Sequence, residues 1–195
     1  MSRSRTSSEK AGGRGRIVVL SGPSGVGKTT VSSALLEDPR MKRVITATTR
    51  CPRPGEVDGI DYLFMTRPDF ARHRENGDFL EWAEVHGEFY ATPSAPVEAL
   101  VSAGKDALLV IDVQGAAQVK SSGVNALFLF LLPPTLDILR ERLTGRGTER
   151  KDQVDRRLET AARETAEAAW FDHQVVNDSL ESTVAELREI LAYPE

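Results

Sequence analysis

The stretch Ser21-Gly-Pro-Ser-Gly-Val-Gly-Lys-Thr-Thr30 decides the fold. Residues 22–29 match the pattern G-x-x-x-x-G-K-[ST] at every specified position, directly after a β-branched run at 16–20 and before a helical pattern. The glycines let the backbone curl so that successive N–H groups point at phosphate oxygens, and the helix N-terminus adds partial positive charge. A glycine-rich turn with a chance lysine is the alternative, and the flanking strand and helix oppose it. The stretch therefore predicts a site for a nucleoside triphosphate.

Two side chains of this loop have specific expected roles. Lys28 is expected to reach the β- and γ-phosphates of the nucleoside triphosphate, and the Thr29 hydroxyl to ligate Mg²⁺. Asp112 follows a buried run at 107–111, where it would either help to hold the metal through water or cap the next helix, and both roles are compatible. The residues expected to contact the triphosphate are Gly22, Pro23, Ser24, Gly25, Val26, Gly27, Lys28, Thr29 and Thr30.

Buried-strand patterns alternate with helical patterns along the rest of the chain. Strands are expected at 16–20, 43–47, 107–111, 124–132 and 174–177. Helices are expected from 28 to about 37, and over 114–120, 135–143, 152–168 and 180–191. This alternation predicts an α/β fold with a mostly parallel sheet flanked by helices.

The composition and the hydrophobic pattern of the sequence change between residues 48 and 96. Prolines and glycines punctuate short alternating runs at 62–64 and 79–85, with a brief helical pattern at 67–75 between them. The segment therefore predicts a small mixed or antiparallel insert. The expected division is a basic tail at 1–15 and one domain at 16–195. Within that domain we expect a core (16–47, 97–141 and 159–195), the insert (48–96) and a lid (142–158).

Length and composition limit the possible functions. The chain has 195 residues, which suits one compact domain, and no apolar run approaches the roughly 18 residues that a membrane-spanning helix requires. The net charge is −4, and an acidic body argues against a general nucleic-acid binder. A single cysteine, Cys51, fits a reducing compartment, so a cytoplasmic location is expected. The basic tail is expected to be disordered, with a weak polyanion contact as the alternative.

A second informative segment runs from Thr48 to Phe64. Arg50 and Arg53 are three residues apart, and Pro52 stiffens the chain between them. A rigid pair of guanidinium groups suits bidentate binding of a phosphate dianion, and Tyr62 would add a hydroxyl donor. From spacing alone, a charged surface loop whose arginines face water remains the alternative.

Taken with the phosphate loop, this segment resembles the guanylate kinase family, whose members phosphorylate GMP. The family signature is T-[ST]-R-x-x-[KR], followed by an acidic residue, a glycine and Y-x-F, and the resemblance runs from about Arg16 to the C-terminus. It implies a P-loop NTPase core with a parallel sheet, a GMP-binding insert and a helical lid. The matching residues are Thr48, Thr49, Arg50, Arg53, Glu56, Gly59, Tyr62 and Phe64.

The resemblance also assigns the acceptor site. It implies that Glu81 accepts hydrogen bonds from guanine N1 and the exocyclic amine, a role that suits a carboxylate because guanine presents two adjacent donors. Thr46 and Thr92 would complete the contacts to the base edge, and Asp112 is counted with the substrate-binding residues. The residues implied to hold the GMP phosphate are Arg50, Arg53, Tyr62 and Tyr90.

The lid is implied at residues 142–158, where glycines flank Arg146. Phosphoryl transfer needs positive charge around the moving γ-phosphate, and the family positions that supply it match Arg142, Arg146 and Arg157. Asn177 resembles the family's adenine contact, although a turn-forming asparagine is the alternative.

Three positions depart from the family pattern. Ala91 stands where the family usually has glycine, and Thr46 where it often has serine. Val110 replaces a carboxylate that is common in the family, which removes one possible polar contact to the acceptor nucleoside.

The expected reaction is Mg²⁺-dependent, in-line phosphoryl transfer from ATP to GMP, with dGMP as a second acceptor, in purine nucleotide metabolism. No nucleic-acid or membrane partner is expected, and the sequence identifies no protein partner. The alternatives are a non-catalytic interaction module of this fold, which the intact loop opposes, and a phosphotransferase with another acceptor, which the segment at 48–64 opposes.

Overall fold

The computed structural model describes residues 13–85, 87–144 and 151–192, with side chains omitted from the description at 151–154. The strands are β1 (Ile17–Ser21), β2 (Met41–Arg43), β3 (Ala47–Thr48), β4 (Leu63–Phe64), β5 (Phe79–Val85), β6 (Glu88–Pro93), β7 (Asp106–Val110), β8 (Ala126–Leu132) and β9 (His173–Val176). The helices are α1 (Lys28–Leu35), α2 (Arg67–Glu75), α3 (Ser94–Ser102), α4 (Val113–Ser121), α5 (Leu136–Thr144), α6 (Lys151–Ala166) and α7 (Leu180–Leu191), with a 3₁₀ turn at Glu167–Trp170.

The core is a parallel sheet with the strand order β2-β7-β1-β8-β9. β1 lies at its centre, and all five of its residues are buried. Ile17 and Val19 pack into one apolar cluster while Val18 and Leu20 pack into another, as the alternation of side chains along a strand requires. A strand with both faces covered is expected to be apolar, and this holds for Ile17–Leu20, while Ser21 at its end is a buried polar residue.

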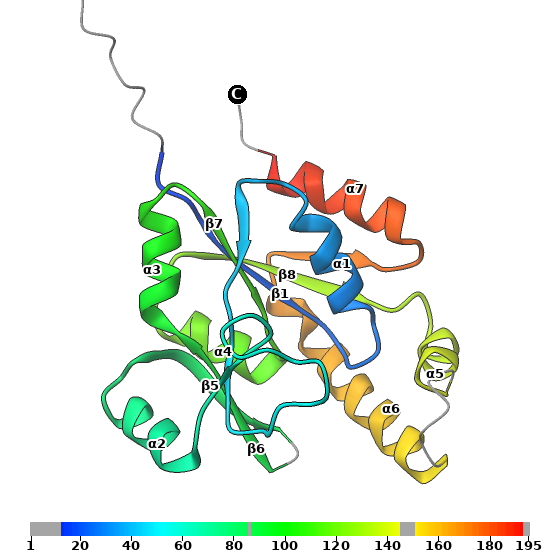
Figure 1. Ribbon diagram of the computed structural model, residues 1–195. Helices are drawn as coiled ribbons and strands as arrows, with labels where there is room; N and C mark the ends of the chain where they lie inside the picture. The colour runs from blue at the N-terminus through cyan, green and yellow to red at the C-terminus, as the bar shows by residue number, and fades with distance from the viewer. Residues whose placement is uncertain (1–12, 86, 145–150, 193–195) are drawn as a thin grey trace, which may run out of the picture.

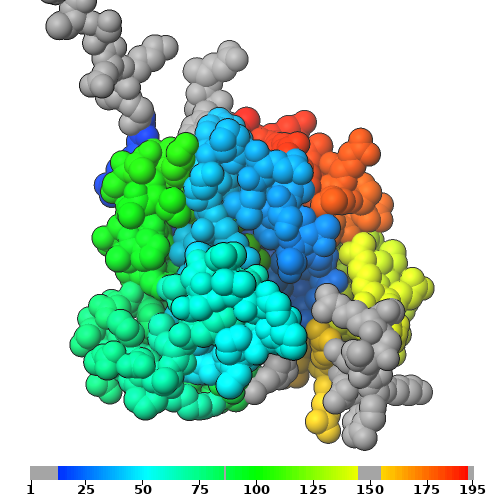
Figure 2. Space-filling model, in the orientation of Figure 1, coloured from blue at the N-terminus to red at the C-terminus, as the bar shows by residue number. Residues whose placement is uncertain are grey.

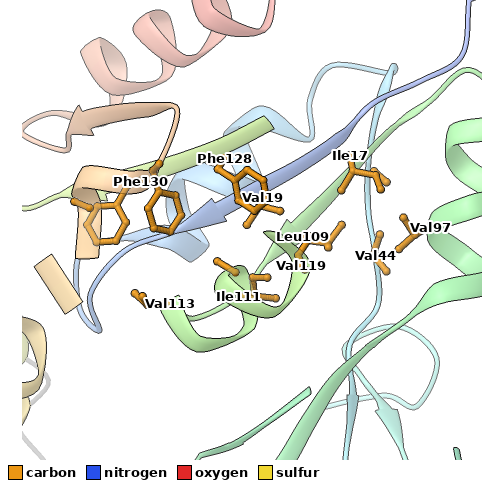
Figure 3. Close-up of a cluster of buried hydrophobic side chains, with 14 residues drawn as sticks. Ile17, Val19, Val44, Val97, Leu109, Ile111, Val113, Val119, Phe128 and Phe130 are labelled. Carbon is orange, nitrogen blue, oxygen red and sulfur yellow. The ribbon is translucent and has the colours of Figure 1, made fainter. Parts of the chain in front are cut away.

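Helices cover both faces of this sheet (Figure 1). α3, α4 and the 3₁₀ turn contribute Val97, Val119 and Ala168 to the cluster on one face, part of which Figure 3 shows. α1 and α7 contribute Val31 and Leu187 to the cluster on the other face. The fold is therefore the α/β architecture that the sequence predicts.

The second sheet has the strand order β4-β3-β6-β5 and is mixed, because β3 pairs with β4 in parallel but with β6 antiparallel. β5 pairs with β6 antiparallel and forms one edge of the sheet. α2 packs on it through the buried Phe70, whose ring lies 4.8 Å from that of Phe79 and 5.3 Å from that of Phe89. Ala91, one of the departures from the family pattern, is completely buried in this small cluster. The mixed insert of the sequence prediction is thus confirmed.

α5 and α6 form a separate helical pair beside the core (Figure 1). Leu139 and Leu143 of α5 pack against Ala161 of α6, and Arg140 is paired with Asp155 at 2.9 Å. Figure 2 shows the surface around residues 20–30 set back between the insert, in cyan, and α5, in yellow. The residues at the loop–α1 junction therefore lie in a recess between the insert and the helical pair.

One expectation about secondary structure is wrong, and two elements are not predicted. The strand expected at 43–47 is two short strands, because the chain leaves the core sheet after Arg43 and enters the second sheet at Ala47. The sequence analysis does not predict β6 or α3. Pro96 is compatible with α3 because it lies in the first turn, where a proline loses no hydrogen bond within the helix.

Candidate functional site

The phosphate loop connects β1 to α1 at the carboxyl edge of the core sheet. Gly27, which precedes α1, has φ 105°, and a Cβ atom added there would lie 2.5 Å from Nδ2 of Asn177. Gly22 has φ 143°, and its added Cβ would lie 2.5 Å from the carbonyl oxygen of Leu131. Both the backbone conformation and the close neighbours therefore require glycine at these positions.

Lys28 lies within the curl of its own loop. Its Nζ donates hydrogen bonds to the carbonyl oxygens of Gly22, at 2.5 Å, and Pro23, at 3.2 Å. Burial lowers the pKa of Lys28, and the carboxylates of Glu164 and Asp112 oppose that effect. The ammonium group is thus held in the phosphate loop by hydrogen bonds to two carbonyl oxygens and by the charges of two nearby carboxylates. Phosphate oxygens of a ligand can replace the carbonyl oxygens.

Asn177 and Arg142 support the phosphate loop through hydrogen bonds to its carbonyl groups. Asn177 is buried, its Nδ2 donates to the carbonyl oxygen of Val26 at 2.6 Å, and its Oδ1 accepts from Thr183 at 3.0 Å. Arg142 donates to the carbonyl oxygens of Val26, at 3.3 Å, and Asn177, at 3.1 Å. The amide of Asn177 thus supports the loop here, and its expected contact with adenine stays a prediction.

α6 brings two charged side chains to the same loop. Arg157 donates to the hydroxyl oxygen of Ser24 at 2.6 Å. Glu164 follows seven residues later on the same face, and burial raises its pKa against the lowering effects of Lys28 and the Ser24 backbone N–H. Its Oε2 is buried without a hydrogen-bond partner among the described residues. Arg146, the third lid arginine of the sequence prediction, lies outside the described residues.

Glu164 is the residue of this site that the sequence analysis missed. The available signal was its position two helical turns after Arg157, which places both on one helix face. That signal does not show which way the face points, and a polar helix face is usually solvated.

The arginine pocket of the insert is assembled around Arg50. Its guanidinium donates to Glu56 at 2.8 Å and to the carbonyl oxygen of Cys51 at 2.8 Å, and lies 5.3 Å from the ring centroid of Tyr62. Hydrogen bonds to Glu56 and Tyr90 raise the pKa of Arg50 above its ordinary value. Arg50, Tyr62 and Tyr90 are thus brought together, as the sequence predicts for a phosphate site.

Two other residues predicted for the acceptor site, Arg53 and Thr46, make hydrogen bonds to described residues through their backbones only. Arg53 donates its backbone N–H to Glu56 at 2.7 Å, while its side chain is exposed to solvent. Thr46 is half-buried, and its carbonyl oxygen accepts from the backbone N–H of Leu63 at 2.9 Å. Neither side chain makes a hydrogen bond with another residue in the described part of the chain.

Glu81 on β5 is a buried carboxylate, with 5% of its surface exposed. Its Oε1 accepts a hydrogen bond from the hydroxyl of Thr92 at 2.5 Å. Burial raises the pKa of Glu81 to about 7, the nearby charge of Asp112 acts in the same direction, and the Thr92 hydroxyl opposes both. A buried carboxylate with little internal compensation is suited to accept hydrogen bonds from a ligand.

Asp112 joins the two halves of the site. It is the N-cap of α4, where its Oδ1 accepts from the backbone N–H of Gly115 at 2.8 Å. Its charge acts on Lys28 in the phosphate loop and on Glu81 in the insert. The predicted helix-cap role is therefore present, and Asp112 lies close enough to both Lys28 and Glu81 for its charge to act on each. Val110, two residues before it, packs against an apolar cluster of the core.

The oxygen donors at the loop suit a hard cation such as Mg²⁺. The Thr29 side chain is exposed at the start of α1, and Asp112 uses one oxygen for its cap. Among the described residues there is no cluster of three or more His, Cys, Asp or Glu residues that could hold a metal. This sparse donor set fits Mg²⁺ in a phosphoryl-transfer site, where phosphate oxygens and waters supply most of the ligands.

In the described part of the chain, no helix is long and apolar enough to cross a membrane.

Known proteins are similar to this chain over most of its length. The family model described as guanylate kinase matches residues 14–193. A guanylate kinase from Thermus thermophilus is 52% identical over 181 residues, which is 92% of this chain and 81% of that protein. A guanylate kinase from Mycobacterium sp. (strain MCS) is 48% identical over 182 residues, or 92% of each chain.

A solved structure is similar as well. The crystal structure of guanylate kinase from Anaplasma phagocytophilum superimposes with a TM-score of 0.75 and 36% sequence identity, covering 92% of this chain and 85% of that one. The resemblance noted from two sequence motifs therefore extends over nearly the whole fold.

Proposed function

This chain belongs to the guanylate kinase family, and on that premise we propose how its residues carry out ATP-dependent phosphorylation of GMP. The chain is an ATP:GMP phosphotransferase, which forms ADP and GDP. What remains to be assigned is the role of each side chain, the use of Mg²⁺ and the range of acceptors.

Glu81 selects the base. A carboxylate accepts hydrogen bonds from both N1–H and the 2-amino group of guanine, whereas adenine offers no donor at N1. Its burial supports this role, because a base without these donors leaves a buried carboxylate unpaired. Thr92 donates to Oε1 of Glu81, and Thr46 and Thr92 complete the contacts to the base edge.

The guanidinium and phenol groups of the insert bind the GMP phosphate. Arg50, Tyr62 and Tyr90 are assembled for this role, and Arg53 lies beside them with its side chain exposed. Glu56 forms an ion pair with the Arg50 guanidinium through one carboxylate oxygen. The phosphate dianion of GMP therefore meets an arginine that is already oriented by an internal anion.

The backbone N–H groups of residues 22–30 cradle the triphosphate, and Lys28 exchanges its carbonyl contacts for phosphate oxygens. Thr29 and one oxygen of Asp112 would hold Mg²⁺, which supplies neutralisation of phosphate charge when bound. Arg157, with Arg142 and Arg146, adds positive charge around the group in transfer. Asn177 contacts the adenine edge in addition to supporting the loop.

Transfer is direct and in line, without a covalent intermediate. The position of Asp112 carries the strongest support: a Cβ atom added to Gly115 would contact both Asp112 and Glu81, and the charge of Asp112 also acts on Lys28, so the donor loop and the base-selecting carboxylate are close together. Positioning and charge stabilisation then supply the rate, with no strong general base. dGMP is a second acceptor, because the contacts proposed for Glu81 and Arg50 are to the base and the phosphate, which dGMP shares with GMP. Residues 48–96 form the acceptor insert and 142–158 the lid, and the enzyme acts in the cytoplasm.

A coupled assay of ADP release with ATP and Mg²⁺ tests the proposal. We expect turnover with GMP and dGMP and rates near background with AMP, UMP and CMP. Omission of Mg²⁺ should abolish turnover, and Lys28→Met serves as the inactive control. Equal rates with GMP and AMP would remove Glu81 from the selecting role.

A further inference from the structure

The base-selecting carboxylate stands on an edge strand. Glu81 lies on β5, which ends the strand order of the second sheet, so that its outer side has no neighbouring strand. An edge strand lacks half of the ladder that would hold a side chain in a fixed place. α4, from the core, packs against this open side of β5 (Figure 1).

A side chain of α4 substitutes for the missing strand. Gln118 donates through Nε2 to the carbonyl oxygen of Trp82 at 2.6 Å, and its Oε1 accepts from the Trp82 backbone N–H at 3.1 Å. The amide thus pairs with both backbone groups of the residue next to Glu81, as a neighbouring strand would. This contact fixes the position of α4 along β5.

One helical turn before Gln118, Gly115 lies directly against the carboxylate. A Cβ atom added to Gly115 would lie 2.5 Å from Oε2 and 3.1 Å from Cδ of Glu81, and 3.5 Å from Oδ1 of Asp112. Residues three apart share a helix face, so Gly115 and Gln118 meet β5 together. Gly115 is buried and has no unusual backbone angle, so the contact with Glu81 accounts for the missing side chain there.

Glu81 has little freedom to move away from an added methyl group. The hydroxyl of Thr92 holds Oε1 at 2.5 Å, and the side chain is buried. A displacement of Oε2 would change the angle at which the carboxylate meets two donors on a planar base.

We infer that Gly115 and Gln118 are positioning residues for guanine recognition, with Gly115 setting the position of Oε2 of Glu81 and Gln118 holding the strand that carries it. The inference rests on the proposed role of Glu81 as the base selector. It assigns to α4 a second task besides covering the core sheet: α4 connects the core to the acceptor pocket.

The test is Gly115→Ala in the full-length protein, with Gln114→Ala as the matched control. Gln114 is exposed in the same turn of α4, so its replacement changes helix propensity without placing an atom near Glu81. Steady-state kinetics should show a KM for GMP raised at least tenfold in Gly115→Ala. The KM for ATP should stay within twofold, and the control should match the wild type. Calorimetry should show the same loss in GMP binding without ATP.

A double variant separates positioning from general damage. Glu81→Asp withdraws the carboxylate by one methylene, so in that background Gly115→Ala should cost less than threefold. A tenfold loss in both backgrounds, or a parallel rise in the KM for ATP, would overturn the inference. An unchanged KM for GMP in Gly115→Ala would overturn it as well. Failure of the wild-type protein to phosphorylate GMP would instead refute the proposed function.

Discussion

Burial of the Glu81 carboxylate should affect both the pH dependence of stability and the recognition of GMP. Replacing Glu81 by glutamine tests both effects. The pKa of Glu81 is raised from 4.5 to about 7, mainly by burial. Because the folded protein holds this proton more tightly than the unfolded chain, stability due to this group is lost as the pH rises from 4.5 to 7. Above pH 7 the full cost is present, and at about 1.4 kcal/mol per pKa unit it amounts to roughly 3 kcal/mol.

Glutamine has no such pH-dependent cost. We expect the free energy of unfolding of Glu81→Gln, relative to the wild type, to increase by about 2 kcal/mol between about pH 5 and pH 8. Urea unfolding at both pH values without nucleotides measures this difference, and the contributions of other titrating groups cancel in the comparison. Glu84→Gln is the matched control, because Glu84 is an exposed residue of the same strand.

The same substitution should weaken GMP recognition. An amide offers one acceptor oxygen where the carboxylate offers two. We therefore expect a loss of about 1–3 kcal/mol in transition-state stabilisation, so that kcat/KM for GMP falls roughly 5- to 150-fold. In the wild type, kcat/KM should fall about tenfold from pH 8 to pH 6, because the carboxylate becomes protonated with a pKa of about 7.

The phosphate of GMP also titrates, with a pKa of about 6, and its effect on kcat/KM should be present in both the wild type and Glu81→Gln. The step near pH 7 should be absent in Glu81→Gln and present in Glu84→Gln. A Glu81→Gln protein with the wild-type pH profile, and kcat/KM within threefold of it, would refute the assignment of Glu81 as the selector.

Three further substitutions address the phosphate contacts. Lys28→Met should abolish turnover, because the γ-phosphate loses its ammonium partner, while calorimetry still detects GMP binding; an equal loss of GMP affinity in a folded protein would contradict this division of roles. Arg50→Lys should raise the KM for GMP by about 10- to 100-fold, since a lysine cannot bind a phosphate bidentately, and a KM within twofold of the wild type would place the phosphate elsewhere. Arg157→Ala should lower kcat by about 10² with a smaller change in the KM for ATP, and a change below threefold in single-turnover experiments would remove it from the transfer step.

The backbone of the phosphate loop could be predicted because its determinants are local. Glycines, lysine and threonine at fixed spacing, between a strand and a helix, specify both the backbone curl and the chemistry. The structure adds the support of that loop, in which Asn177 donates to Val26 across 151 positions of the chain. Such a contact depends on β9 lying beside β8, which no local pattern indicates.

The acceptor site could be predicted only through the resemblance to a family. Spacing alone left Arg50 and Arg53 open to interpretation as a solvated loop, and the structure engages the side chain of Arg50 while that of Arg53 is exposed. Glu164 and Gly115 could not be found from sequence. Their importance depends on which faces of α6 and α4 meet the loop and β5, and packing decides that, not periodicity.

The central claim is that a triphosphate cradle and a guanine-selecting pocket open onto one space, and parallel initial-rate measurements with five monophosphates test it most directly. With ATP and Mg²⁺ in excess, kcat/KM for GMP should exceed that for AMP, UMP and CMP by about 10² or more, with dGMP closer to GMP. The preference for GMP over AMP should collapse in Glu81→Gln but not in Glu84→Gln. Well-folded protein that phosphorylates AMP as readily as GMP, or whose preference survives the loss of the Glu81 carboxylate, would contradict the claim.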